Sequence, residues 1–395
     1  MRIALFFITV FLIGCDLKKN TTSDKEIRVN YIEQINLSEL IDSQFEYVPL
    51  QTTSVPLIGS IHKVVATDST YFVLDSQFSK RLFVFNKRGE FLRTIGEKGE
   101  GDGEYLNPSE VIVSKNNIEI VDGSNFSILR FNAIGEFEEE YRVPYWVNEA
   151  FQYNEDSKII YCPTDYSPNG KVDMGVVSIV SNDFSKTLNS FFPYEEVLDD
   201  APFPGFLSYH NDSFTYVKTI LGEFYTINEK MEAVPRFKVD FGKHQWPVDL
   251  EVLKSDQEEV EKLFLQGGIM SIAHRLCENP DYLTFHTLMI DRDKGYRKIV
   301  ESRDRWLCIF NKANEQLYAI KQVINDIDNV PFSFPIAVDN DYFVGVLSPE
   351  LLHRQRSLHQ DISGYDLHIL NLMDTVNDTS NPILIKFKFR SDLFN

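Results

Sequence analysis

The chain has 395 residues, a hydrophobic content of 43% and a formal net charge of −20. This length suits one large domain or two ordinary ones, and the apolar fraction is enough for a substantial core. A surface this acidic repels phosphate backbones, which argues against nucleic acid as a partner. Phenylalanine (31) and tyrosine (18) are frequent, and both residue types favour strands.

The first fifteen residues have the parts of a lipoprotein signal peptide. Arg2 supplies the positive charge, and the apolar run from Ile3 to Ile13 is too short to span a bilayer as a mature helix. Leu12-Ile13-Gly14-Cys15 resembles a bacterial lipobox. We therefore expect a signal peptide over residues 1–15, lipid on Cys15 and anchoring in the cell envelope, at the outer membrane. The alternative is an ordinary signal peptide with an incidental cysteine, and the sequence leaves the periplasmic or surface face open.

Residues 16–35 begin with the charged run DLKKNTTSDKEIR, and we expect them to form a flexible tether between lipid and domain. The folded domain is then expected over residues 36–395. A short helical turn is predicted at Ser38–Ile41, and a strand at Phe45–Leu50.

A repeat begins near His62. The motif Phe-Asn-x-x-Gly-Glu-Phe occurs in full around Asn86 and Asn132, each time in a hairpin that ends a set of four short strands. Shorter copies follow at Asn182, Asn228, Asn311 and Asn371. The steps between these asparagines are 46, 50, 46, 83 and 60 residues, and a four-stranded propeller blade takes roughly 40–50. The repeat predicts an all-β, six-bladed β-propeller with one short helical insertion.

The insertion is expected at about 248–273, inside the longest step. Ser255 to Glu258 is a capping box, Val260 and Leu263 share a helical face, and a helix is predicted near 256–266. Two interpretations stay open, a helix that fills a connection and a lid over the central channel. Closure of the ring requires a strand from one terminus, either Phe45–Leu50 or Ile383–Phe389.

Three segments carry a family resemblance: Phe45–Thr53, Leu57–Ile61 and the glycine-rich Gly96–Tyr105. They resemble six-bladed β-propeller lipoproteins of Bacteroides-type bacteria, which are related in architecture to NHL-repeat and TolB-like propellers. Asp102 stands where that family commonly has proline. The resemblance implies an envelope lipoprotein of largely uncharacterised activity. The glycines predict a turn between blades, because the phosphate-binding alternative needs a following helix.

The sequence offers no catalytic or metal motif. Cys162, Cys277 and Cys308 do not have zinc-ligand spacing, and the histidines form no compact ligand motif. We therefore expect no cofactor, no metal and at least one free thiol.

Ligand contacts are expected beside the irregular segment, at Trp246, His274 and His286. Aromatic runs at 144–146, 203–206 and 245–247 suit either stacking on a ligand or packing between blades. The expected function is a non-catalytic binding or scaffold module that recognises a protein, peptide or glycan on one propeller face. The alternative is a glycan-active lyase or hydrolase at the channel mouth. Convergent histidine, arginine, tyrosine and carboxylate groups in a deep channel would favour the enzyme, and a flat or plugged channel would favour the binding module.

Overall fold

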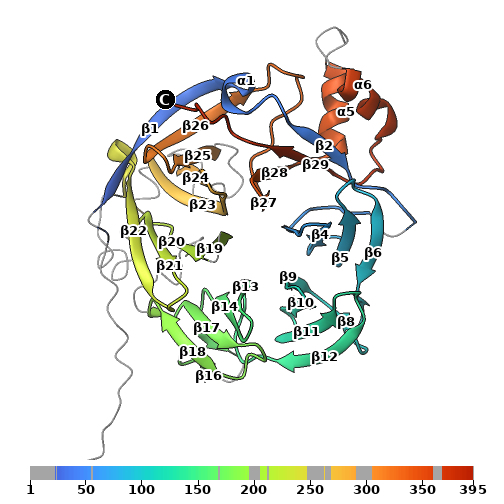
Figure 1. The fold of residues 1–395 in the computed structure, drawn as a ribbon, viewed down its shortest axis with the longest axis vertical. Helices are drawn as coiled ribbons and strands as arrows, with labels where there is room; N and C mark the ends of the chain where they lie inside the picture. The colour runs from blue at the N-terminus through green and yellow to red at the C-terminus, as the bar shows by residue number, and fades with distance from the viewer. Residues whose placement is uncertain are drawn as a thin grey trace, which may run out of the picture.

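The computed structural model describes residues 23, 25–54, 57–167, 170–194, 205–210, 213–246, 262, 268–290, 305–358 and 367–394. Its strands are arranged radially around a central axis as six blades, each with four antiparallel strands (Figure 1). This arrangement confirms the all-β, six-bladed propeller that the repeat predicts.

Five blades follow one another along the chain, and each runs from the centre outwards. Blade 1 contains β3 (Lys63–Ala66), β4 (Thr70–Asp75), β5 (Arg81–Asn86) and β6 (Phe91–Ile95). Blade 2 contains β9 (Pro108–Val113), β10 (Asn117–Asp122), β11 (Ser127–Asn132) and β12 (Phe137–Arg142). Blade 3 contains β13 (Glu149–Asn154), β14 (Ser157–Tyr161), β17 (Val177–Ser181) and β18 (Thr187–Phe191). Blade 4 contains β19 (Gly205–His210), β20 (Ser213–Lys218), β21 (Glu223–Ile227) and β22 (Ala233–Asp240). Blade 5 contains β23 (Ile269–Glu278), β24 (Tyr282–Ile290), β25 (Arg305–Asn311) and β26 (Gln316–Ile324).

Two short ladders lie outside the blades. They pair β7 (Glu97–Lys98) with β8 (Glu104–Tyr105), and β15 (Tyr166–Ser167) with β16 (Gly170–Lys171). The first ladder is the glycine-rich connection from blade 1 to blade 2. Tyr105 is fully buried there, and its hydroxyl donates to Ile95 O at 2.9 Å. A Cβ on Gly96, whose φ is +62°, would come within 2.7 Å of the Tyr105 ring. The glycine-rich run is therefore a packed turn between blades, as predicted.

Blade 6 closes the ring with both ends of the chain. It contains β27 (Ala337–Asp339), β28 (Tyr342–Leu347), β29 (Ile383–Phe387) and β2 (Glu46–Pro49). The outermost strand β2 pairs antiparallel with β29, from Glu46 opposite Lys386 to Pro49 opposite Ile383. The N-terminal segment thus supplies the closing strand, which settles the question that the sequence leaves open.

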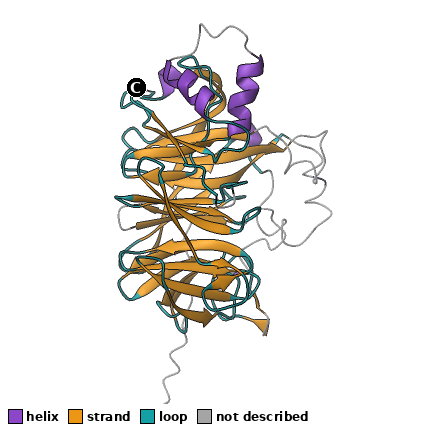
Figure 2. Cartoon of the chain, turned by 90° about the vertical axis from the view of Figure 1, so that its right-hand side faces the viewer, coloured by secondary structure: helices purple, strands orange, loops and turns teal. Residues whose placement is uncertain are grey.

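The hairpin predicted at Asn371 is wrong. Asn371 lies in α6 (Leu367–Thr375), which follows α5 (Pro349–Leu358) in the connection from β28 to β29. Figure 2 shows both helices together at one rim of the disc. In blade 6 the third and fourth strands come from opposite ends of the chain, so no hairpin joins them. The apolar residues Ile369 and Leu372 are buried as one face of a helix instead.

The tether expected over 16–35 is too long. Glu26–Asn36 form β1, which pairs parallel with β22 through Glu26–Arg28 and with β26 through Val29–Asn36. Ile27 and Val29 are buried, so the strand inserts its alternate apolar side chains beside blades 4 and 5. The predicted helical turn is present as α1 (Leu37–Leu40).

The predicted helical insertion is also too long at its C-terminal end. Residues 269–273 belong to β23, and Met270 and Ile272 are fully buried there. Both side chains are part of the core between blades 4 and 5. They reach it because the backbone of residues 269–273 is extended, so that alternate side chains point to the same face. After blade 4 the short 3₁₀ helix η2 (Gly242–His244) is present. The helix predicted near 256–266 lies outside the described residues, apart from Lys262.

The repeated asparagine has a structural role. Asn86 Oδ1 accepts hydrogen bonds from the backbone N–H groups of Arg88 and Glu90, at 2.9 and 3.0 Å. Asn132 does the same with the residues two and four positions after it, at 3.1 and 3.0 Å. The side chain thus satisfies backbone donors that the tight turn leaves unpaired, which explains why the motif marks the outer hairpins.

We predict that Gly89→Ala destabilises the ring. Gly89 has a φ of +80°, and a Cβ there would lie 2.2 Å from Pro49 O on β2. Strain and clash together should lower the free energy of unfolding by about 2–4 kcal/mol. Gly170→Ala is the control, because its φ is +110° but no described atom would lie within 4 Å of the added Cβ, so it should cost about 1 kcal/mol. Denaturant titration measures both, and equal losses would contradict the importance of contact with the closing strand.

Candidate functional site

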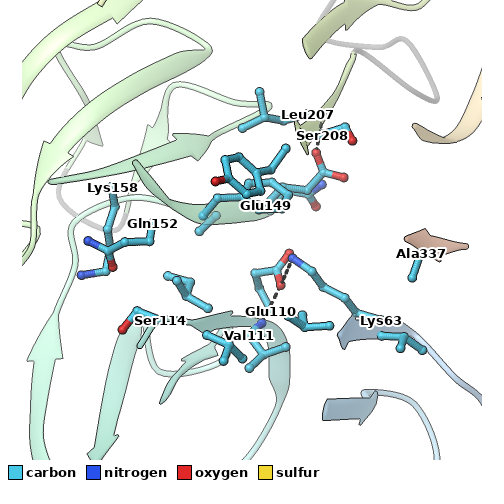
Figure 3. A pocket seen from close by; sticks show the side chains of 18 of the residues that line it. Lys63, Glu110, Val111, Ser114, Glu149, Gln152, Lys158, Leu207, Ser208 and Ala337 are labelled. Carbon is cyan, nitrogen blue, oxygen red and sulfur yellow. Dashed lines mark hydrogen bonds and ion pairs between the residues drawn. The ribbon is translucent and has the colours of Figure 1, made fainter. Parts of the chain in front are cut away.

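The inner strands enclose a cavity of about 1540 Å³ along the propeller axis. It is lined by residues of β3, β9, β13, β19, β23 and β27. Because every blade runs from its inner to its outer strand, the inner strands share one direction along the axis. Lys63, Glu110 and Glu149 lie near the beginning of β3, β9 and β13, so they lie together toward one end of the cavity (Figure 3).

Lys63 and Glu110 form an ion pair inside this cavity. Lys63 Nζ lies 2.6 Å from Glu110 Oε1, and the two side chains are 18% and 3% exposed. Burial raises the pKa of Glu110, and the Lys63 ammonium opposes that rise. The same ammonium lies 4.4 Å from the ring centroid of Phe151. Because the ammonium and the carboxylate neutralise each other, the Lys63–Glu110 pair adds little net charge to the cavity.

Glu149 is the candidate with the most unusual chemistry. Its Oε2 accepts a hydrogen bond from Leu207 N of β19 at 2.6 Å. Burial raises the pKa of Glu149 to about 8, because Lys63 and Arg275 offset only part of the desolvation. Its carboxyl group is thus largely protonated at neutral pH. In a cavity, such a group donates a hydrogen bond as well as accepting one.

Two buried tyrosines surround the same carboxyl group. Tyr161 on β14 and Tyr216 on β20 interact electrostatically with Glu149, and burial raises the pKa of both hydroxyls. Among the described residues neither hydroxyl has a hydrogen-bond partner. Buried hydroxyls without a hydrogen-bond partner are uncommon in folded proteins. These two add possible hydrogen-bond donors and acceptors to the region around Glu149.

Arg275 reaches the cavity from blade 5. Its backbone has a φ of +42°, and the register of β23 against β24 shifts between His274 and Cys277. Arg275 Nη2 donates to His62 O at 2.9 Å and to Ile61 O at 3.4 Å, both in the segment that leads into β3. Blade 6 lies between these blades, but its inner strand β27 has three residues. Arg275 therefore spans the space beside that short strand.

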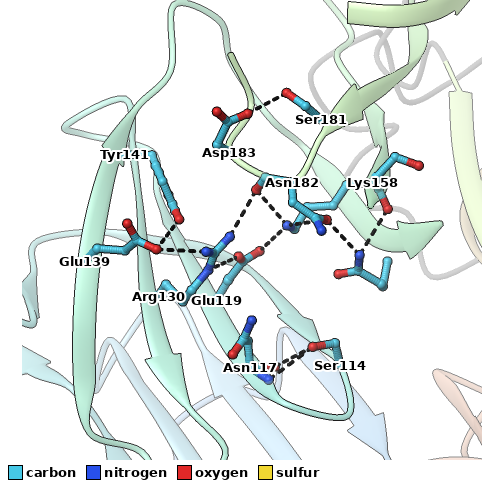
Figure 4. Close-up of polar contacts among 12 residues, drawn as sticks. Ser114, Asn117, Glu119, Arg130, Glu139, Tyr141, Lys158, Ser181, Asn182 and Asp183 are labelled. Carbon is cyan, nitrogen blue, oxygen red and sulfur yellow. Dashed lines mark hydrogen bonds and ion pairs between the residues drawn. The ribbon is translucent and has the colours of Figure 1, made fainter. Parts of the chain in front are cut away.

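A second polar cluster joins blades 2 and 3 (Figure 4). Glu119 on β10 lies 2.8 Å from Arg130 Nε and 3.1 Å from Lys158 Nζ. Lys158 is 1% exposed, and its ammonium also donates to Asn182 O at 2.9 Å. Burial lowers the pKa of Lys158, and Glu119 opposes that effect. Because every charged group here has a partner, the cluster holds blades together, although it borders the cavity.

Trp146 marks the end of the cavity at which the inner strands begin. It precedes β13 by three residues, is 37% exposed and is part of the cavity lining. Its ring packs edge-on against Phe126, with centroids 5.8 Å apart. Trp146 thus presents a fixed aromatic surface beside the charged residues, as the aromatic runs of the sequence suggest for a stacking platform.

The structure describes the side chains of two of the three predicted ligand contacts, Trp246 and His286. Trp246 is buried at 7% exposure after η2. His274 and His286 are opposite each other on β23 and β24, and the ring of His286 packs against Phe334 at 5.0 Å. Neither Trp246 nor His286 is among the described residues that line the cavity, and the side chain of His274 lies outside the described part. Their role as ligand contacts stays a prediction, and Cys15 also lies outside the described residues.

Sequence reasoning missed Lys63, Glu110, Glu149 and Arg275. The sequence did contain a signal for two of them. Lys63 and Glu110 are 47 residues apart, and the same distance separates Asp75 and Asp122, which end the second strands of blades 1 and 2. Lys63 and Glu110 are charged residues in inner strands, where apolar residues are the norm. Arg275 gives no such signal, since its position depends on an irregularity in β23.

The described residues contain no group of three or more potential ligands that could hold a metal ion. Cys162, Cys277 and Cys308 are free and buried. Burial raises the pKa of Cys277 and of Cys308 to about 12, so these thiols are inert. Within the described part of the chain, no helix combines the length and the apolar character needed to cross a bilayer.

The fold and the cavity define the class, a six-bladed β-propeller with an axial cavity lined by polar and apolar residues. The chain belongs to the family described as Domain of unknown function (DUF4934), which matches residues 23–388. A Bacteroides fragilis protein assigned as exported is similar in structure, with a TM-score of 0.73, 17% identity, and coverage of 93% of this chain and 100% of that one. A Bacteroides vulgatus member of the DUF4221 family has a TM-score of 0.54, 9% identity, and coverage of 89% and 97%. At these identities the likeness establishes the fold alone. No curated protein matches the chain.

We predict that Glu119→Gln destabilises the protein by about 3–5 kcal/mol, because it leaves the buried Lys158 without its charge partner. Glu139→Gln is the matched control. Glu139 also pairs with Arg130, at 2.8 Å, but its side chain is 49% exposed, so the cost should be at most about 1 kcal/mol. Denaturant unfolding of both variants checks the assignment, and a small effect of Glu119→Gln would show that the cluster does not join the blades.

We also predict that Glu149 makes stability depend on pH. Its ordinary pKa of 4.5 applies to the unfolded chain, and about 8 applies to the folded one. Between these values the unfolded chain loses the proton first, so the free energy of unfolding falls as pH rises through this window. Glu149→Gln removes this contribution, so its stability relative to wild type should increase from pH 5 to pH 9. A difference that stays constant with pH would contradict the raised pKa.

Proposed function

We propose that the mature protein is an exported, lipid-anchored module that binds a glycan at the end of the axial cavity marked by Trp146. The exposed indole carries this proposal, because aromatic faces stack on the apolar faces of sugar rings. Neutral hydrogen-bonding side chains surround the cavity, as sugar hydroxyls require. They include Gln77, Asn107, Ser109, Asn148 and Ser208. Among the three ligand classes expected from the sequence, a glycan fits this mixture best.

Export and anchoring rest on the sequence and on the comparisons. Three observations support them: the lipobox-like run that ends at Cys15, the resemblance to Bacteroides-type propeller lipoproteins of NHL-repeat and TolB-like architecture, and the likeness to a Bacteroides fragilis protein assigned as exported. Ten residues separate Cys15 from Glu26, the first residue of β1. Ten residues reach at most about 35 Å. The lipid would therefore hold the rim formed by blades 4 and 5 close to the membrane.

A glycan-active lyase or hydrolase is the second candidate, and Glu149 favours it. A carboxyl group that is protonated at neutral pH can act as a general acid, and burial raises the pKa of Glu149 to about 8. The cavity lining also includes the residue types that an enzyme would need there, histidine, arginine, tyrosine and carboxylate: His62, Arg275, Tyr153, Glu110 and Glu149. However, Glu110 is held in an ion pair with Lys63, so the second carboxylate that a glycosidase needs is engaged. We therefore rank binding first.

Trp146→Ala should weaken glycan binding about tenfold, since a lost aromatic contact costs about 1.4 kcal/mol. Tyr209→Ala is the control, because Tyr209 is 46% exposed and lines the cavity near the end of β19, toward the opposite end. A glycan array followed by calorimetry with the purified mature chain measures both. Equal losses would place the ligand elsewhere, and capture of peptides in place of glycans would contradict the proposal.

Prolonged incubation with a bound glycan separates the two candidates. The binding module leaves the mass of the glycan unchanged. Products that form with the wild type and disappear with Glu149→Gln would establish the enzyme instead.

Lipidation is tested in cells. Cys15→Ala should abolish palmitate labelling and release the protein from membranes. Labelling that survives this change would contradict an anchor at Cys15.

A further inference from the structure

Arg275 differs from the other cations of the cavity. Lys63 has Glu110 as its partner, and Lys158 and Arg130 share Glu119. Among the described residues no carboxylate forms an ion pair with Arg275, whose described contacts are the backbone carbonyls of Ile61 and His62. Both carbonyls are bound through Nη2, and no described residue forms a hydrogen bond with Nε or Nη1, which are therefore offered as donors at the cavity wall.

The backbone at Arg275 is strained. A φ of +42° is uncommon for a residue with a side chain, and the register shifts next to it. Strain of this kind persists where the surrounding structure enforces it, and it is common at ligand sites. Here the irregularity brings a guanidinium group across the space beside β27, where a regular β23 would continue its pairing with β24.

Among the described residues at this end of the cavity, Arg275 is a cation without a carboxylate partner. The Lys63 and Glu110 charges cancel, and Glu149 is largely uncharged at neutral pH, since burial raises its pKa to about 8. Arg275 therefore makes this region positive, in a chain whose formal net charge is −20. An acidic protein repels anions in general, so a positive group inside its cavity selects an anionic group that enters there.

We propose that Arg275, together with Lys63 and Glu149, binds the carboxylate of an acidic glycan, one that contains hexuronic acid units. This inference rests on the proposed function and specifies its ligand. Arginine presents parallel N–H donors that match the two oxygens of a carboxylate. The protonated Glu149 donates a hydrogen bond to the same group, and Trp146 stacks on a neighbouring sugar ring.

The affinity depends on pH through Glu149. The charged and titratable groups that face it come from five strands: Lys63 on β3, Glu110 on β9, Tyr161 on β14, Tyr216 on β20 and Arg275 on β23. As pH rises through about 8, Glu149 loses its proton, repels the ligand carboxylate and competes with it for Arg275. Affinity for the acidic glycan should therefore fall over this range.

The experiment is calorimetry of the mature chain with trimers of galacturonic, glucuronic and mannuronic acid, each paired with its carboxyl-reduced counterpart. At pH 6.5 one acidic trimer should bind at least about tenfold more tightly than its reduced form. Arg275→Gln should reduce the acidic affinity to that of the reduced trimer and leave the reduced trimer unaffected. Arg88→Gln is the control, because Arg88 is 79% exposed on an outer hairpin, and it should change neither affinity.

The outcomes separate this inference from the proposed function. Equal binding of acidic and reduced trimers, unchanged by Arg275→Gln, would overturn the inference and leave glycan binding intact. Binding of no glycan would overturn both. If Arg275→Gln does not fold, the wild type decides: the acidic affinity should fall at least about fivefold between pH 6.5 and pH 9, and the reduced trimer should show no such fall. A constant ratio between the two ligands would overturn the role of this site.

Discussion

The pairing of β2 with β29 is the constraint on which the ring depends. It joins segments more than three hundred residues apart, because Val48 lies opposite Leu384. Hydrogen bonds beside it strengthen the junction: Ile58 N donates to Asn381 Oδ1 at 2.9 Å, and Asn381 N donates to Thr52 Oγ1 at 2.9 Å. Without β2, blade 6 would have three strands and an exposed edge. Closure fixes the six inner strands around one cavity, so the cavity side chains are held in place before any ligand binds.

The least regular blade also shapes the candidate site. Blade 6 has a three-residue inner strand, and Pro331 and Pro335 in the preceding segment cannot donate backbone hydrogen bonds to a ladder. The neighbouring β23 contains the irregularity that brings Arg275 to the backbone of His62. The asymmetry of the cavity thus lies beside the blade that closes the ring. In a propeller of six identical blades, a regular inner strand would not place an arginine beside its neighbouring blade in this way.

Local sequence patterns predict the regular part of this fold and not the irregular part. Asn86 and Asn132 mark hairpins because their side chains complete the turns, and Asp75 and Asp122 recur because each accepts backbone donors of the preceding connection. The pairing of β1 could not be predicted, since its partners lie some two hundred and three hundred residues away. The sequence at Asn371 matches the repeat because the apolar pair Ile369-Leu370 before it is also typical of a strand, although the segment forms a helix. The candidate site combines residues from several blades, and the shift that positions Arg275 has no local sequence signature.

A crystal structure of the mature chain with a bound acidic trisaccharide would show whether the axial cavity holds the ligand. We expect a sugar ring on Trp146 and a carboxylate within hydrogen-bonding distance of Arg275. Density for the sugar at the outer hairpins or beside α5 and α6, with the cavity unchanged, would contradict it.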